Sequence, residues 1–350
     1  MSLLEEKSQN TTPISQLGEF GLIDHLTKNI KLKNENTIKG VGDDAAVIDI
    51  GDKYQLVSTD LLVEGVHFDL GYMPLKHLGY KSVAVNVSDI CAMNGDAKQI
   101  TVGLAMSNRF TVESLDELYA GIYLACEHYG VDLVGGDTTS STAGLMISVT
   151  VLGEVEKENV VYRSGAKIND LVICTGDLGA AYLGLQLLNR EKEMFKENPT
   201  MQPDLTGNDY VLQRQLKPEA GVKYIKILKD LDIIPTSMID ISDGLSSEVL
   251  HLSKSSKVGI TIHEDKIPVD YTTMNLANEF NMNPITCALS GGEDYELLFT
   301  ISQAHYDKFK KDADFTIVGY VTDASEGNNF IAKDGTLHPL TAQGWDALKK

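Results

Sequence analysis

Cysteine is scarce in this chain, and no two cysteines form a CxxC motif. Its four cysteines are far apart, and each lies among apolar residues: Cys91, Cys126, Cys174 and Cys287. A disulfide framework or a zinc site would need regularly and closely spaced ligands. The pattern is instead typical of buried, reduced thiols. We therefore expect a cytoplasmic protein.

Long apolar runs are also missing. The longest, such as Leu145–Leu152, are interrupted by Ser or Thr and are far shorter than the roughly 18 residues of a membrane helix. The first ten residues, MSLLEEKSQN, contain neither the basic nor the apolar part of a secretory signal. We expect no membrane association.

Positive charge is in deficit, with 30 Lys and Arg against 50 Asp and Glu, a formal net charge of −20. Such a surface repels nucleic acid and anionic lipid, so neither is an expected partner. The excess carboxylates serve either to solvate the surface or to bind cations where they cluster.

Familiar nucleotide-binding and catalytic motifs are absent as well. The sequence has no GxxxxGK[ST] phosphate loop, no GxGxxG, no GxSxG and no HRD or DFG motif. Its eight histidines are scattered, and no calcium-binding EF-hand spacing occurs. A bound nucleotide would therefore depend on metal ions and backbone amides.

The length of 350 residues and the 43% hydrophobic content indicate two domains. We expect a leader over 1–16, an N-terminal domain over 17–153 and a C-terminal domain over 154–350, with a polar linker at Glu154–Asn159. Helical and strand patterns are mixed throughout, so the class is α+β or α/β. The polar stretch Arg190–Gln215 is interpreted as a surface insertion that is helical in part.

The periodicity of apolar residues predicts the individual elements. Expected helices are Glu19–Ile30, Pro74–Met93, Thr111–Tyr129, Leu178–Asn189, Pro218–Leu231 and Leu245–Ser255. Expected strands are Ala46–Ile50, Gln55–Ser58, Ile100–Met106, Val131–Val134, Leu145–Leu152, Leu171–Cys174, Ser237–Ile241 and segments near Ile260, Leu297 and Ile317. The range Pro74–Met93 fits both periods, and its length and proline start favour a helix.

Five short segments each place Asp in a small-residue turn beside an apolar run. They are Gly42-Asp43-Asp44-Ala45, Ser58-Thr59-Asp60, Asn86-Val87-Ser88-Asp89, Gly135-Gly136-Asp137-Thr138-Thr139 and Asp240-Ile241-Ser242-Asp243-Gly244. Each alone is explained by turn formation or helix capping. Together they predict carboxylates at loop tips that hold magnesium, a hard ion bound by a few carboxylates plus substrate phosphates.

These segments also carry a family resemblance. Together with Gly18-Glu19-Phe20, His67-Phe68, Arg163-Ser164-Gly165-Ala166 and Ser290-Gly291-Gly292-Glu293-Asp294-Tyr295-Glu296-Leu297, they resemble the motifs of the thiamine-monophosphate kinases. The motifs follow the order of that family across roughly residues 18–345, and the ordered set is far more specific than any one of them.

The resemblance implies a two-domain fold like that of aminoimidazole ribonucleotide synthetase, a PurM-like fold. Its N-terminal α+β domain forms the sheet of a homodimer, and its C-terminal domain is α/β. The implied reaction is direct transfer of the γ-phosphoryl group of ATP to thiamine monophosphate, giving thiamine diphosphate, with several Mg²⁺ ions. An ionised phosphate is the nucleophile, so no general base is required.

The resemblance also implies roles for particular residues. The implied magnesium ligands are Asp44, Ser58, Thr59, Asp60, Asp89, Asp137, Asp240 and Asp243. The implied ATP contacts are Tyr119, Gly136, Asp137, Arg163 and Ser242. The implied contacts to the thiamine moiety are His67, Glu293 and Trp345. From the residues alone, His67 could equally pack in the fold, Glu293 could cap a turn, and Trp345 could anchor the tail.

Other interpretations stay open at this point. Selenophosphate synthetase would show a reactive Cys or selenocysteine near the N-terminus, and the first Cys here is Cys91. The carbamoyl dehydratase of hydrogenase maturation would end in Cys, whereas this chain ends in Leu348-Lys349-Lys350. The signature of aminoimidazole ribonucleotide synthetase itself is not apparent. From a different class, an acidic cation-binding protein would bind metal without turning over ATP.

Overall fold

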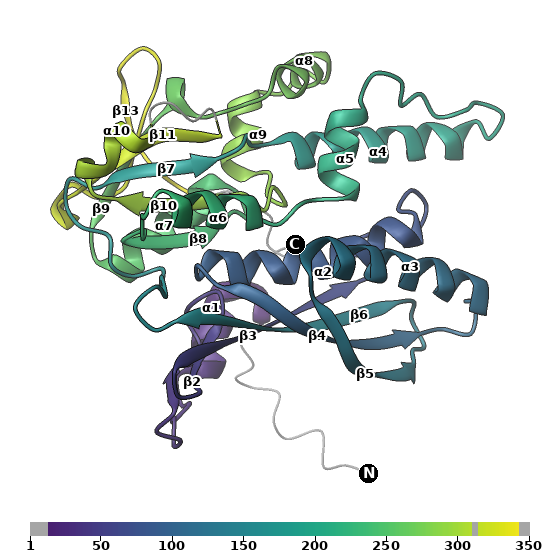
Figure 1. Ribbon diagram of the computed structural model, residues 1–350. Helices are drawn as coiled ribbons and strands as arrows, with labels where there is room; N and C mark the ends of the chain where they lie inside the picture. Colours follow the sequence, from purple (N-terminus) through teal and green to yellow (C-terminus); the bar gives the residue numbers. More distant parts are fainter. Residues whose placement is uncertain (1–12, 310–313, 343–350) are drawn as a thin grey trace, which may run out of the picture.

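The computed structural model describes residues 13–309 and 314–342. Two mixed sheets form its two halves, which lie one above the other in Figure 1. The first half, coloured purple to blue, contains a six-stranded sheet, and the second half, coloured teal to yellow, contains a seven-stranded sheet. The predicted boundary between residues 153 and 154 stays a prediction.

The first sheet has the strand order β1-β2-β3-β6-β4-β5. Its strands are β1 (Thr37–Lys39), β2 (Ala46–Asp49), β3 (Lys53–Val63), β6 (Met146–Glu156), β4 (Asp96–Met106) and β5 (Asp132–Ser140). Neighbours are antiparallel except β4 and β5, which are parallel. Along β6 the side chains alternate, so that Ile147, Val149 and Val151 are buried while Ser148 and Thr150 lie on the opposite face.

Three helices accompany this sheet: α1 (Gly18–Thr27), α2 (Leu75–Ala92) and α3 (Val112–Tyr129). The expected helix at Pro74–Met93 is confirmed as α2, and Thr111 caps α3 by accepting the backbone N–H of Ser114. Glycines let α2 and α3 approach closely. A Cβ on Gly79 would lie 2.0 Å from the Leu118 carbonyl oxygen, and one on Gly121 would lie 1.9 Å from that of Lys76.

The second sheet has the order β13-β12-β9-β11-β7-β10-β8 and is antiparallel except between β12 and β9. Its strands are β13 (Leu337–Pro339), β12 (Asn329–Ile331), β9 (Gly259–His263), β11 (Phe315–Thr322), β7 (Leu171–Thr175), β10 (Leu297–Ile301) and β8 (Ser237–Asp240). The strands expected near Ile260, Leu297 and Ile317 are confirmed. With both sheets mixed and mostly antiparallel, the α+β class holds.

The helices of the second half are α4 (Ala180–Glu197), α5 (Asp209–Leu216), α6 (Val222–Asp230), α7 (Leu245–Ser256), α8 (Tyr271–Glu279), α9 (Pro284–Ser290) and α10 (Tyr306–Phe309). The range Arg190–Gln215 is exposed over residues 193–204, as expected of a surface insertion, and it is helical in part, because the end of α4 and most of α5 fall in it. Its C-terminal end departs from that expectation, since Gln215 is 2% exposed.

Helix α2 lies between the halves, where it contacts the first sheet, β8, α5 and α6 (Figure 1). Fourteen of its eighteen residues are buried, among them Lys81, Asn86 and Ser88. A helix buried on all sides must place any polar side chain against a partner. Its polar residues therefore indicate where the two halves share a polar site.

Candidate active site

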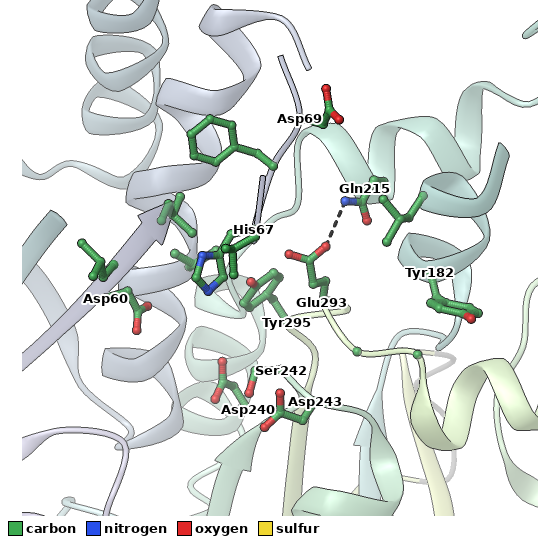
Figure 2. Close-up of a pocket in the computed structure, with 18 of the residues that line it drawn as sticks. Asp60, His67, Asp69, Tyr182, Gln215, Asp240, Ser242, Asp243, Glu293 and Tyr295 are labelled. Carbon is green, nitrogen blue, oxygen red and sulfur yellow. Dashed lines mark hydrogen bonds between the residues drawn. The ribbon is translucent and has the colours of Figure 1, made fainter. Parts of the chain in front are cut away.

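A cavity of about 500 Å³ lies between the two halves, within the range of small-molecule sites. Seven carboxylates line it: Glu19, Asp60, Asp69, Asp89, Asp240, Asp243 and Glu293. Among the described residues, no lysine or arginine lines it. In Figure 2, Asp240, Ser242 and Asp243 lie together below Glu293, with Asp60 and His67 to the left and Tyr182 to the right.

Three aspartates from separate elements converge beside this cavity. Carboxylate oxygens of Asp44, Asp89 and Asp240 lie within 4.8 Å of one another. Asp44 precedes β2, Asp89 is in the last turn of α2, and Asp240 ends β8. Hydroxyl groups orient two of them: Ser58 Oγ donates to Asp89 at 2.6 Å, and Ser88 Oγ donates to Asp240 at 2.7 Å.

Burial makes the charges of this cluster costly. Burial raises the pKa of Asp44 to about 7 and that of Asp240 to about 6, with Arg163 opposing both shifts. Burial together with the neighbouring Asp60, Asp240 and Asp44 raises the pKa of Asp89 well above its usual range. Buried carboxylates with raised pKa values mark functional-site candidates.

Oxygen atoms without a hydrogen bond fit a cation here. Among the described residues, Asp44 Oδ2 and Glu248 Oε2 are buried and have no hydrogen-bond partner. The other oxygen of Glu248 accepts the backbone N–H of Asp243 at 3.0 Å. A donor set made of carboxylates and hydroxyls is the kind that magnesium prefers.

The aspartates are not all at loop tips, and that part of the sequence interpretation was wrong. Asp60 lies within β3, Asp89 within α2 and Asp137 within β5. Asp60 nevertheless lines the cavity together with Asp89 of α2, and its backbone N–H donates to Asn86 Oδ1 of the same helix at 3.0 Å. Burial raises the pKa of Asp60 to about 6.

Strand alternation separates Thr59 from the other implied ligands. Ser58 and Asp60 project to the face that α2 covers, so Thr59 projects to the opposite face. There its hydroxyl donates to the Val149 carbonyl oxygen at 3.1 Å and accepts from Thr150. The Thr59 side chain does not converge with the carboxylates.

The implied ATP contacts are divided between two places. Ser242 lines the cavity, and Arg163 lies behind Asp44, whose Oδ1 accepts its guanidinium at 2.6 and 3.2 Å. Tyr119 on α3 and Gly136 and Asp137 on β5 do not line the cavity. Gly136 has a structural requirement of its own, since a Cβ there would lie 2.0 Å from the Val102 carbonyl oxygen.

Two of the three implied substrate contacts are in the cavity. His67 accepts the Val63 backbone N–H through Nδ1 at 3.0 Å, and burial lowers its pKa, so the imidazole is neutral with its proton on Nε2. Glu293 also lines the cavity. Trp345 lies outside the described residues.

Lys81 was missed by the sequence interpretation. Its ammonium is buried behind Glu293 and donates to Glu293 Oε1 at 2.8 Å, while Gln215 Nε2 donates to Glu293 Oε2 at 2.9 Å. The pair joins α2 of the first half to the segment before β10 of the second. The available signal was one lysine in the run Leu78–Val87, which contains no other charged residue.

An apolar wall completes the cavity. Phe68, Tyr72, Val66, Tyr182 and Leu185 lie along it, with Asn189 and Asp69 beside them. Aromatic rings next to a carboxylate-rich end suit a ligand with one flat organic part and one charged part.

Several known proteins resemble this chain along most of its length. Residues 42–155 match the family model of the AIR synthase related protein, N-terminal domain. The thiamine-monophosphate kinase of Aquifex aeolicus is 35% identical over 332 residues, covering 95% of this chain and 98% of that protein. The Bacillus subtilis enzyme of the same name is 34% identical and covers 95% of this chain and 100% of its own length.

The chain belongs to the thiamine-monophosphate kinase family.

A solved structure of a family member, described as AaThiL complexed with AMPPCP and TMP, superposes with a TM-score of 0.81 at 33% identity. It covers 96% of this chain and 99% of that one. Hydrogenase maturation protein HypE in complex with ATP is 16% identical with a TM-score of 0.65, which shows the shared fold. The PurM-like fold expected of a thiamine-monophosphate kinase is thereby confirmed.

None of the helices in the described part of the chain has the length and hydrophobicity that crossing a membrane requires.

Proposed function

We propose that this chain transfers the γ-phosphoryl group of ATP to thiamine monophosphate, forming thiamine diphosphate and ADP. The observation that carries the proposal is the match along 95% of the chain to thiamine-monophosphate kinases. The cavity adds chemical support, because its carboxylate-rich end and its aromatic wall suit an acceptor that joins a phosphate to flat rings.

The reaction brings two polyanions together in an acidic cavity. Two unit charges 4 Å apart repel by about 4 kcal/mol at an effective dielectric constant near 20. We propose that Asp44, Asp60, Asp89 and Asp240 hold Mg²⁺, with Ser58 and Ser88 fixing the orientation of Asp89 and Asp240. Bound magnesium would neutralise charge on the phosphates in the manner usual for phosphoryl transfer.

The residues of the chain would position the substrates rather than transfer protons. The acceptor phosphate is already ionised at neutral pH, so its oxygen needs no base to act as a nucleophile. The neutral His67 and the Lys81–Glu293–Gln215 group border the cavity and would orient the acceptor. Asp243 and Ser242, in the loop between β8 and α7, would contact the metal and ATP.

Asp137 requires a second chain in this proposal. Strand β5 is the edge of the first sheet. Across the sheet, Asp60 on β3 lies in one row with Val149 on β6, Val102 on β4 and Gly136 on β5. Asp137 is the next residue along β5, where it pairs with Gly103. Three strand spacings of about 4.8 Å separate them, roughly 14 Å, too far to bind one ion. We propose that the chain is a homodimer in which Asp137, Gly136 and Tyr119 serve the site of the partner subunit.

The unpaired edge of β5 supports this assembly. Val134 on this strand is 59% exposed, and β5 pairs only with β4 among the described strands. An exposed strand edge with an apolar residue favours association with another chain. We also propose a cytoplasmic location, which the free thiols of all four cysteines support.

The direct test is turnover. The protein is incubated with Mg-ATP and thiamine monophosphate, and the products are identified by chromatography and ³¹P NMR. We expect thiamine diphosphate and ADP in equal amounts, and no product with thiamine or aminoimidazole acceptors. ATP hydrolysis without thiamine diphosphate, or metal binding without ATP turnover, would refute the proposal.

Glu293→Gln tests the acceptor end of the site. Losing the charge that Lys81 faces disturbs the acceptor side of the cavity, so we expect the KM for thiamine monophosphate to rise about tenfold and that for ATP less than about twofold. Glu158→Gln, an exposed change outside the cavity, is the matched control. A larger rise in the KM for ATP than for the acceptor would exclude this role.

A further inference from the structure

The segment 291–296, between α9 and β10, holds a strained backbone at the cavity. Gly292 has φ 70°, Glu293 φ 61° and Tyr295 φ 52°. Non-glycine residues adopt left-handed conformations only where their surroundings determine them, and such strain is found at functional sites. Some part of the fold must therefore hold this segment in place.

Left-handed residues alternate here with residues that face away from the cavity. Glu293 and Tyr295 line the cavity (Figure 2). Asp294 and Glu296 turn to the opposite side and are only 2% and 5% exposed. The residue that binds Asp294 and Glu296 therefore determines the direction in which Glu293 and Tyr295 point.

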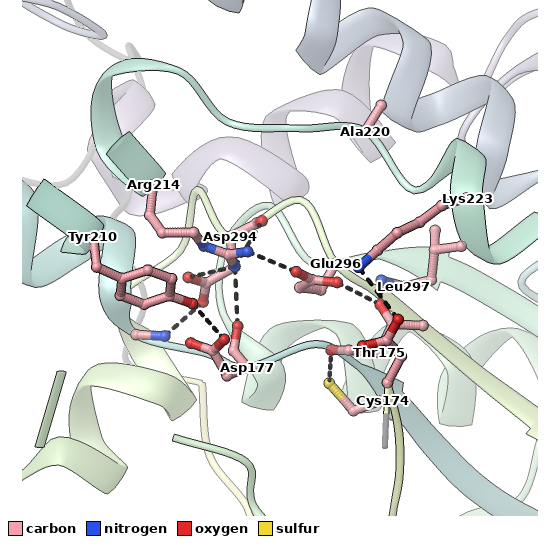
Figure 3. Close-up of polar contacts among 12 residues, drawn as sticks. Cys174, Thr175, Asp177, Tyr210, Arg214, Ala220, Lys223, Asp294, Glu296 and Leu297 are labelled. Atoms are coloured by element: carbon pink, nitrogen blue, oxygen red, sulfur yellow. Dashed lines mark hydrogen bonds and ion pairs between the residues drawn. The ribbon is translucent and has the colours of Figure 1, made fainter. Parts of the chain in front are cut away.

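Arg214 on α5 binds the second pair (Figure 3). Its Nη1 donates to Glu296 Oε1 at 2.7 Å, and its Nη2 donates to the Asp294 carbonyl oxygen at 3.3 Å and lies 3.7 Å from Asp294 Oδ1. The same Nη2 donates to the Asp177 carbonyl oxygen at 2.9 Å. The planar guanidinium, with donors in several fixed directions, suits this group of acceptors better than an ammonium would.

The remaining oxygens of the two carboxylates are fixed by the end of β7 and by the turn between β7 and α4. Thr175 Oγ1 donates to Glu296 Oε2 at 2.6 Å, and the Gly179 backbone N–H donates to Asp294 Oδ2 at 2.9 Å. On the cavity side, the backbone N–H groups of Glu293 and Tyr295 donate to Ser242 and Ile241 carbonyl oxygens at 2.7 and 2.9 Å. The segment thus also fixes the loop that follows Asp240.

Two consecutive residues of helix α5 bind opposite sides of the segment 291–296. Arg214 binds the far side, and Gln215 donates to the carboxylate of Glu293 on the cavity side. Gln215 already belongs to the group that borders the cavity, whereas Arg214 has no role in the proposed function so far.

We propose that Arg214 is a positioning residue, which orients Glu293 and Tyr295 toward the acceptor by holding Asp294 and Glu296 on the opposite side of the segment. Its kinetic consequences rest on the proposed function, whereas its structural consequence does not. A role confined to the stability of the second half would predict neither selective loss of acceptor binding nor local opening of this segment.

The experiment compares Arg214→Ala and Arg214→Lys with Arg190→Ala. Arg190 also binds two carboxylates, those of Glu191 and Glu279, but none in the segment 291–296. For Arg214→Ala we expect the KM for thiamine monophosphate to rise about tenfold, with the KM for ATP changed less than about twofold. Arg214→Lys keeps the charge and the fold, and we expect it to show the same selectivity with a smaller rise.

Two further readouts separate positioning from general stability. Hydrogen exchange at the amides of Glu293 and Tyr295 is expected to accelerate at least about tenfold in both Arg214 variants, while exchange in the strands of the first sheet stays unchanged. Guanidinium at about 20 mM, far below denaturing concentrations, is expected to restore acceptor binding in Arg214→Ala, whereas NaCl at the same concentration is not.

Two results would overturn the proposal: unchanged exchange at Glu293 and Tyr295 in a folded variant, or an equal rise in both KM values. If Arg214→Ala does not fold, the same two measurements on Arg214→Lys decide between positioning and stability. If the wild type forms no thiamine diphosphate, the proposed function fails, and the exchange measurement still tests the positioning role.

Discussion

Asp240→Asn is expected to lower kcat at least about 10³-fold and at the same time to stabilise the metal-free protein. The catalytic loss follows because the proposed metal site would lose one of three carboxylates whose oxygens lie within 4.8 Å of one another, and removing one electrostatic group from a transition-state site typically costs about 10²–10³ or more. Steady-state kinetics at saturating Mg-ATP and thiamine monophosphate measure it.

The gain in stability also follows from the charge of Asp240, because in the metal-free protein this charge repels the neighbouring carboxylates and destabilises the fold. Two ionised carboxylates 4.8 Å apart repel by about 3 kcal/mol at an effective dielectric constant of 20, and raised pKa values reduce this only by partial protonation. Asparagine keeps the shape and still accepts from Ser88. We therefore expect Tm in EDTA to rise by about 2–5 °C.

Magnesium should raise the Tm of the wild type above that of Asp240→Asn, the reverse of the order expected in EDTA. A ligand that binds only the folded state stabilises it by RT ln(1 + [L]/Kd). The Tm of the wild type is thus expected to rise with Mg²⁺, and that of Asp240→Asn to respond less. Asp230→Asn, an exposed change on α6, is the matched control. A kcat within about tenfold of wild type would falsify the metal assignment.

The sequence motifs include Asp44, Asp89 and Asp240, which the structure brings together, but they did not reveal the structural settings of the aspartates. Small residues and turn formers around Asp60 and Asp137 favour loops locally, yet both lie within strands of the first sheet. Pairing with neighbouring strands, a non-local interaction, overrides local propensity. Asp44 and Asp243 have no such strand pairing and lie in loops as predicted.

Helix α2 shows why the periodicity of apolar residues alone does not distinguish a helix from a strand when the element is buried on all sides. Its sequence alternates Val83, Val85 and Val87 as a strand would, and length together with the proline start favoured the helix. The two halves bury almost all of α2, so its apolar residues need not follow a single stripe. The same burial explains why Lys81 was overlooked, because its partner Glu293 lies 212 positions away in the chain.

The burial of the C-terminal end of the polar range before α6 could not be predicted for a related reason. Composition distinguishes polar residues from apolar ones but not exposed polar residues from buried, paired ones. Arg214 and Gln215 are held inside the fold because their partners, Glu296 and Glu293, come from a distant motif. That motif was recognised from its own sequence, and its support from α5 could only be seen in the fold.

Two inactive variants should restore activity when they are combined in one dimer. We expect Asp60→Asn and Asp137→Asn each to lower kcat at least about 10³-fold as homodimers. If each site takes Asp60 from one subunit and Asp137 from the partner subunit, a heterodimer of the two variants has one intact site and one doubly altered site. Its activity should be about half that of the wild type.

The reciprocal heterodimer makes the test unambiguous. A chain carrying both substitutions, paired with a wild-type chain, has no intact site if the sites are shared, and one intact site if each chain is self-sufficient. Differently tagged chains, co-expressed and purified through both tags, give each heterodimer for direct assay. Half activity in the reciprocal pair and none in the first would show that Asp60 and Asp137 act within one chain across the roughly 14 Å between β3 and β5. Failure to isolate any heterodimer would refute the homodimer itself.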